Sequence, residues 1–178
     1  MKGKFQYDYY RMTGKRFSWG GVITILSDAS VRYMYCHRKI TEKDSRNIFI
    51  RMARKSLIKK NGLEILSPDI GAGLYIGHPF GININESAII GENCNIHKGV
   101  TIGQENRGKR KGSPIIGNNV WIGVNATVVG KVHIGDDVLI APNSYVNCDI
   151  PSHSVVFGNP CKVKYSENAT AGYINRID

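Results

Sequence analysis

Histidine and cysteine are the residues of this chain with the widest chemical range, and the sequence has five histidines and four cysteines. His78 stands out among them, because it lies between a glycine and a proline in the stretch YIGHPFGININ, residues 75–85. An imidazole titrates near neutral pH, so it can accept a proton, donate one or bind a metal ion. His78 is therefore the first residue for which a chemical role must be sought.

Metal binding is the role that the spacing favours least. The cysteines form no CxxC pair and have no zinc-like spacing to a histidine, so we expect four free thiols: Cys36, Cys94, Cys148 and Cys161. A zinc site of the carbonic anhydrase type needs three converging histidines. His78 and His97 are candidates, but no third histidine falls nearby in register, and we expect no metal.

The segment that holds His78 belongs to a repeat of six residues. Isoleucine or valine recurs at this interval in three phases: Ile70, Ile76 and Ile82; Ile84, Ile90, Ile96 and Ile102; Ile116, Ile122, Val128, Ile134, Ile140 and Val146. Helices have a period of 3.6 and strands of 2, so neither alone explains six. A triangular coil does, since each side is one short strand plus a turn. We therefore predict a mainly β fold, a parallel β-helix of about five coils.

The repeat slips twice, by two residues between Ile82 and Ile84 and by a longer insertion between Ile102 and Ile116. A coil has no room inside for extra residues, so these must bulge outward. The second insertion gives a protruding loop, 103–115, with four basic residues between Arg107 and Lys111. Long loops on rigid scaffolds often carry function. We expect this loop to fold over an active site and to touch a phosphate-bearing ligand.

Residues 1–62 differ from the repeat and are predicted to form a short N-terminal α-helical region. One helix is expected to start at a Thr41 cap and to end at Asn61-Gly62, with an apolar face of Ile48, Met52 and Leu57. An earlier helix is expected over 27–40. The coils then span 63–163, and 164–178 forms a C-terminal tail.

Composition narrows the class of partner. Hydrophobic residues make up 42% of the 178, which is typical of a folded domain, and the formal net charge is +10. The charge indicates an anionic partner: nucleic acid, a phosphate-bearing cofactor or an anionic membrane. The basic loop lacks aromatic residues that would stack on bases, so we expect no nucleic acid. The N-terminus has no apolar signal core, which predicts a cytoplasmic protein.

Residues 64–163 resemble the serine acetyltransferases. The resemblance rests on GHPFGININESAIIGENCNIHKGVTIG, on IIGNNVWIGVNATVVGKVHIGDDVLIAPNSYV and on the final GNPCKV. It implies a left-handed β-helix and acetyl transfer from the cosubstrate acetyl-CoA to a hydroxyl. It also implies a homotrimer with active sites between neighbouring prisms. The N-terminal region is shorter than in the best-known members and resembles short forms from polysaccharide biosynthesis, which favours a trimer over a hexamer.

The resemblance also assigns site residues. His78 matches the catalytic histidine, which would act as general base. Glu64 is the predicted orienting carboxylate, with Asp69 as its competitor. The positions that match coenzyme A contacts are Gly103, Gly123, Val124, Ala141, Pro142 and Lys162. The predicted acceptor-binding residues are Gly77, Lys111 and Ser113.

The acceptor is where the chain departs from the pattern. Serine acetyltransferases usually carry an acid just before the catalytic histidine and an Arg-His pair before the proline that ends the loop. This chain has Gly77, Gly112 and Ser113 there. We therefore expect a sugar hydroxyl of a surface-polysaccharide precursor as acceptor, with serine O-acetyltransferase activity as the alternative. A non-catalytic trimeric scaffold is the remote alternative. The basic helix Arg46–Lys60 could provide a peripheral contact with a membrane surface.

Overall fold

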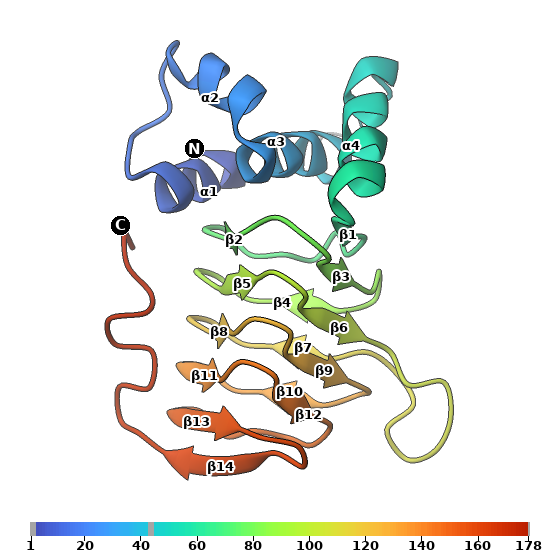
Figure 1. The fold of residues 1–178 in the computed structure, drawn as a ribbon, viewed down its shortest axis with the longest axis vertical. Helices are drawn as coiled ribbons and strands as arrows, with labels where there is room; N and C mark the ends of the chain where they lie inside the picture. The colour runs from blue at the N-terminus through green and yellow to red at the C-terminus, as the bar shows by residue number, and fades with distance from the viewer. Residues whose placement is uncertain (1–2, 43–44, 178) are drawn as a thin grey trace.

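Four helices cover one end of a stack of short strands (Figure 1). The computed structural model describes residues 3–42 and 45–177. The helices are α1 (Lys4–Thr13), α2 (Gly21–Ser27), α3 (Ala29–Thr41) and α4 (Ile48–Asn61). Helices α1, α2 and α4 all pack against α3, so the helical region forms one cap on the coils.

The strands form three sheets, which the chain visits in turn. One sheet has the order β1-β3-β6-β9-β12, the second β4-β7-β10, and the third β2-β5-β8-β11-β13-β14. Neighbouring strands are parallel except for the antiparallel pair β13 and β14. We call these sheets A, B and C. The strands are β1 (Glu64–Ile65), β2 (Tyr75–Gly77), β3 (Asn83–Ile84), β4 (Ile89–Ile90), β5 (Asn95–His97), β6 (Thr101–Gly103), β7 (Ile115–Ile116), β8 (Trp121–Ile122), β9 (Thr127–Val129), β10 (His133–Ile134), β11 (Val138–Ile140), β12 (Tyr145–Val146), β13 (Ser154–Phe157) and β14 (Lys162–Tyr165).

The three sheets enclose the core of a prism. Every aliphatic anchor of the six-residue repeat, from Ile70 to Val146, is buried inside it. The glycines at the corner between sheets B and C permit tight stacking, because a Cβ on Gly91 would lie 2.5 Å from the carbonyl oxygen of Gly117. The prediction of a parallel coil with an N-terminal helical region is confirmed. Its left hand remains a prediction.

The helical region differs from the prediction in detail. Helix α4 begins at Ile48, where the Asn47 side chain accepts hydrogen bonds from the N–H groups of Phe49 and Ile50. Thr41 ends α3 instead of capping α4, and the intervening 43–44 lie outside the described residues. The expected apolar face was also wrong in part: Leu57 is buried, but Ile48 and Met52 are exposed. Helices α1 and α2 were not predicted.

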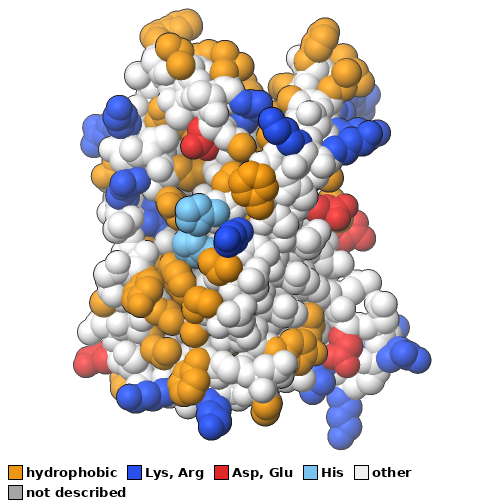
Figure 2. Space-filling view, viewed as in Figure 1, with side chains coloured by type: hydrophobic (Ala, Val, Ile, Leu, Met, Phe, Trp, Pro, Cys, Tyr) orange, Lys and Arg blue, Asp and Glu red, His pale blue; other side chains and the backbone are white. Residues whose placement is uncertain are grey.

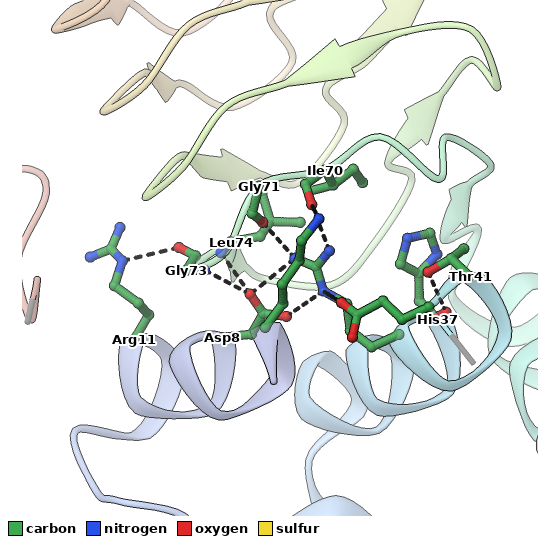
Figure 3. A network of polar contacts seen from close by, with 11 residues as sticks. Asp8, Arg11, His37, Thr41, Ile70, Gly71, Gly73 and Leu74 are labelled. Atoms are coloured by element: carbon green, nitrogen blue, oxygen red, sulfur yellow. Dashed lines mark hydrogen bonds and ion pairs between the residues drawn. The ribbon is translucent and has the colours of Figure 1, made fainter. Parts of the chain in front are cut away.

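A buried ion pair fixes the helical cap to the first coil (Figure 3). Arg38 of α3 donates from Nε to Asp8 of α1 over 2.8 Å, and both side chains are buried. Asp8 Oδ1 accepts hydrogen bonds of 2.9 Å from the N–H groups of Gly73 and Leu74. Arg38 also donates to the carbonyl oxygen of Ile70 over 2.7 Å. Burial raises the pKa of Asp8, while Arg38 opposes that rise.

The C-terminal tail returns along the prism to α1 (Figure 1). On its way it contacts sheet C, where Asn95 donates to the carbonyl oxygen of Tyr173 over 3.1 Å. At the cap, Arg11 donates to the carbonyl oxygen of Asn175, and Arg176 donates to that of Arg11 over 3.2 Å. The tail therefore joins the last coil to the first helix.

Candidate active site

His78 lies at the corner between sheets C and A, directly after β2. Its backbone has a φ of 56°, in the left-handed region that non-glycine residues rarely adopt. The two-residue slip of the repeat falls at this corner, since Ile76 and Ile84 are the anchors on its two sides. The widened corner holds the His78 side chain exposed to solvent. The same backbone conformation recurs at the stacked corners, as at Asn125 and Asn143, so it is part of how the coil turns here.

A second histidine packs beside this corner. Gly77 is the strand partner of His97, so the two residues added by the slip lie outside this pairing. A Cβ on Gly77 would lie 2.4 Å from Nδ1 of His97, so the imidazole of His97 fills the space of a side chain at position 77. The His97 ring lies 4.8 Å from the ring of Trp121. Trp121 was not predicted as a site residue. The six-residue repeat could have placed it in this sheet, because Trp121 of β8 pairs in register with Asn95 of β5.

The surroundings of His97 favour the neutral form of its imidazole. Burial lowers its pKa, and the neighbouring His78 lowers it further. Among the described residues, its buried Nε2 atom has no hydrogen-bond partner. The site therefore has one exposed imidazole and one neutral, half-buried imidazole side by side, and Figure 2 shows adjacent histidine side chains on the surface.

Four predicted coenzyme A positions continue the corner of His78, which we call the histidine corner. Gly123 and Val124 follow β8, and Ala141 and Pro142 follow β11, both between sheets C and A. Backbone hydrogen bonds stack these corners, for example from Asn143 N to Val124 O over 2.9 Å. A Cβ on Gly123 would lie 2.6 Å from Pro142 N, so only glycine fits there. Small residues thus occupy this corner in both coils, with Gly123 buried, and the exposed Lys98 lies in the coil between them and His78.

Three other predicted ligand residues lie at the next corner, between sheets A and B, which we call the loop corner: Gly103, Lys111 and Ser113. Gly103 ends β6, and the loop 104–114 stands out from the prism beyond it (Figure 1). Within the loop, Arg110 forms an ion pair of 3.3 Å with Glu105, and Lys111 is exposed. Ser113 donates to Asn85 Oδ1 over 2.9 Å. One protomer therefore does not bring Lys111 and Ser113 together with Gly77.

The carboxylates predicted to orient His78 are less well defined. Glu64 is exposed in β1 and pairs in register with Asn83. Within the described part of the chain, neither Glu64 nor Asp69 makes a hydrogen bond with His78, so this assignment remains a prediction. Lys162 is exposed in β14 opposite Phe157, near the end of the histidine corner. In residues 3–42 and 45–177, no group of three or more metal-ligating side chains converges.

Comparisons with known proteins agree with this architecture. The family model described as bacterial transferase hexapeptide (six repeats) matches residues 113–148. The serine acetyltransferase of Helicobacter pylori is 36% identical over 135 residues, covering 74% of this chain and 79% of that protein. The serine acetyltransferase of Synechococcus elongatus is 41% identical over 96 residues, or 54% of this chain and 39% of that longer protein. The crystal structure of Neisseria gonorrhoeae serine acetyltransferase in complex with serine superposes with a TM-score of 0.71 at 27% identity, covering 90% of this chain and 67% of that chain.

The stacked hexapeptide coils and the histidine corner define the class as a hexapeptide-repeat acyltransferase. The chain belongs to the serine acetyltransferase family. This confirms the predicted class of enzyme, O-acetyltransferases that use acetyl-CoA as the acyl donor. The likeness to polysaccharide-biosynthesis forms finds no support in these comparisons.

Proposed function

We propose that this chain transfers the acetyl group of acetyl-CoA to the hydroxyl of a small acceptor, with His78 as general base. One observation carries the proposal: the exposed imidazole of His78 begins a corner that has small residues in two later coils, at 123–124 and 141–142, beyond the exposed Lys98 of the coil between. The backbone edge of this corner suits the extended pantetheine arm of coenzyme A, which needs amide donors and acceptors. Family membership supports the same donor.

The reaction needs no acyl-enzyme, because the thioester is already activated. An alcohol is a weak nucleophile at neutral pH, so His78 takes its proton as the oxygen attacks the thioester carbonyl. The tetrahedral intermediate then expels the thiolate of coenzyme A, which receives the proton from the imidazolium. Holding both reactants on one corner supplies a large part of the remaining acceleration.

The site is completed between protomers in this proposal. Gly103, Lys111 and Ser113 lie at the loop corner, one prism edge away from His78 in the same chain. In a cyclic trimer the loop corner of one prism faces the histidine corner of the next, and the basic loop can then meet the phosphates of coenzyme A. Light scattering should give three times the mass of one chain. A monomer at micromolar concentration would contradict this assembly.

L-serine is the acceptor that the comparisons favour. The relatives are named serine acetyltransferases, and two neighbouring structures are complexes with serine. The alternative made from the sequence is thus better supported than the sugar acceptor. The neutral imidazole of His97, in the space of a side chain at position 77, could accept a hydrogen bond from the ammonium group of serine.

A sugar hydroxyl is the second candidate, and the same pair of residues favours it. Position 77 provides no carboxylate to pair with an ammonium group, because His97 leaves no room for one. Leaving a charged group desolvated and unpaired costs free energy, so an uncharged acceptor suits this site.

The deciding experiment is an acceptor screen that follows release of the free thiol of coenzyme A. Purified protein is given acetyl-CoA with L-serine, with neutral sugars or with nucleotide sugars. We expect L-serine to give the highest kcat/KM. A sugar that exceeds serine by about tenfold or more would overturn the serine assignment and leave the acetyl transfer intact. If none of the acceptors raises thiol release above the background hydrolysis of acetyl-CoA, the whole proposal is overturned.

A further inference from the structure

The helical cap ends in two groups of exposed apolar side chains. One group surrounds α2 and the other begins α4; we call them the apolar tips. The side chain of Trp19 is 95% exposed, and that of Phe49 is 78% exposed. The remaining members are Val22, Ile23 and Leu26 near α2, and Ile48 and Met52 in α4. Figure 2 shows both tips projecting at the end of the molecule away from the last coils.

The helices that carry the tips already pack against the rest of the protein through their inner faces, and the tips lie on their outer faces. In α2, a Cβ on Gly21 would lie 2.8 Å from the ring of Phe17, so this helix is held tightly on its inner side. In α4, Leu57 is buried in the core, and Ile58 packs against that core. Packing within the protomer therefore does not account for the outward apolar faces.

Exposed basic side chains accompany both helices. Lys15 and Arg16 precede α2 in the sequence, Arg51 and Lys55 follow Phe49 along α4, and Lys59 and Lys60 lie at the other end of α4. Asp28, the exposed acid at the end of α2, already accepts a hydrogen bond from Val31 N as the cap of α3. Apolar tips with a basic surround match an interface with phospholipid, where acyl chains meet anionic headgroups.

We propose that the two apolar tips dock the protein onto an anionic lipid surface. A second copy is the competing occupant, and the charges argue against it. A two-fold contact would bring the same lysines and arginines of both copies together, which is unfavourable. The tips are also separated by a hollow in Figure 2, and a fluid lipid surface accommodates separate projections better than a rigid copy does.

Among residues 3–42 and 45–177, no helix is long and apolar enough to cross a bilayer. The proposed contact therefore lies in the interface plane, as for amphipathic helices with tryptophan on the apolar side. His78 lies in the coil nearest the cap, so docking would hold the histidine corner close to the lipid surface. The inference does not depend on which acceptor the enzyme uses.

The test measures vesicle binding of the full chain by co-sedimentation. Phosphatidylcholine vesicles are compared with vesicles that contain about 30% phosphatidylserine. We expect partitioning at least about tenfold stronger onto the anionic vesicles, and a large loss in about 0.5 M salt. A Trp121→Phe variant leaves Trp19 as the single tryptophan, and its emission should move to shorter wavelength on anionic vesicles.

Matched variants distinguish binding through the tips from non-specific adsorption to vesicles. Ile23→Ser with Phe49→Ser removes exposed side chains and should reduce partitioning about tenfold or more. Tyr165→Ser removes a side chain that is 70% exposed on β14, at the other end of the prism, and should leave partitioning unchanged. Equal binding to both vesicle types, or none to either, would overturn the proposal. Assembly beyond the trimer that Phe49→Ser abolishes would assign the tips to a second copy instead.

Discussion

Gly77 and His97 share one volume: a Cβ at position 77 would lie 2.4 Å from Nδ1 of the His97 ring. The ring has little freedom to move away, because Trp121 packs on it at 4.8 Å between ring centroids. The residue before the exposed histidine is therefore a glycine as long as position 97 is a histidine. Two positions twenty residues apart in sequence therefore determine together which side chain faces the acceptor.

This shared volume predicts a coupling between two substitutions. Gly77→Ala alone should destabilise the fold by about 1–3 kcal/mol, because the added methyl overpacks the site. In a His97→Ala background the same change should cost much less, since the ring is gone. A double-mutant cycle of urea unfolding measures the difference. Additive effects would mean that the two residues do not compete for space.

His78→Ala should lower acetyl transfer by about 10²–10⁴-fold while binding of coenzyme A persists, because a general base contributes to the transition state and not to donor binding. Thiol release gives the rate, and calorimetry gives the affinity. His133→Ala, which removes an exposed imidazole from β10, is the control and should retain full activity. Turnover by His78→Ala near that of the control would remove His78 from its proposed role.

The orienting carboxylate is tested by a pair of isosteric changes. Glu64→Gln should lower kcat at least about tenfold with little change in KM, because a carboxylate stabilises the imidazolium in the transition state. Asp69→Asn should leave kcat near its original value. If Asp69→Asn is the damaging change, the two assignments must be exchanged.

Asp8→Asn should destabilise the protein by about 3–5 kcal/mol, since it leaves the buried guanidinium of Arg38 without its charged partner. Thermal unfolding measures the loss. Glu105→Gln breaks the exposed pair with Arg110 and should cost at most about 1 kcal/mol. Similar losses of stability in the two variants would show that burial does not determine how much each ion pair stabilises the protein.

Acid sensitivity should trace in part to His37. Burial, together with the nearby charges of Arg54 and Arg38, lowers its pKa to about 3. The unfolded histidine titrates near 6.5, so between these values the unfolded state binds more protons and stability falls as the pH decreases. At pH 5 the loss from this group is about 2 kcal/mol. His37→Phe should show a smaller difference in unfolding free energy between pH 7 and pH 5, and an unchanged difference would exclude His37 as the cause.

The coils could be predicted from sequence because each anchor acts locally. An aliphatic residue at every sixth position fixes one buried side of the prism, and residues such as Ile122 and Val128 are fully buried as expected. The same logic located the protruding loop. It also put the helix start at Thr41, because a plausible cap was visible there and the better one, Asn47, was overlooked.

What the sequence could not reveal depends on contacts between distant residues. Nothing near Asp8 indicates its ion pair with Arg38, since the two side chains meet only once α1 and α3 pack. The separation of Ser113 from Gly77 likewise depends on which corner of the prism each occupies. Alignment with a family pattern groups residues of one site without saying which protomer supplies each.

The C-terminal tail changes how such a prism should lose its structure. Open solenoids fray from their ends, because each coil contacts only its neighbours. Here Arg176 and Arg11 hold the two ends of the chain together, 165 residues apart in sequence. Closing so long a loop slows folding, since the entropy is lost before the contact forms. Once formed, the contact restrains the first and last coils together. Hydrogen exchange should therefore detect their opening as one cooperative event.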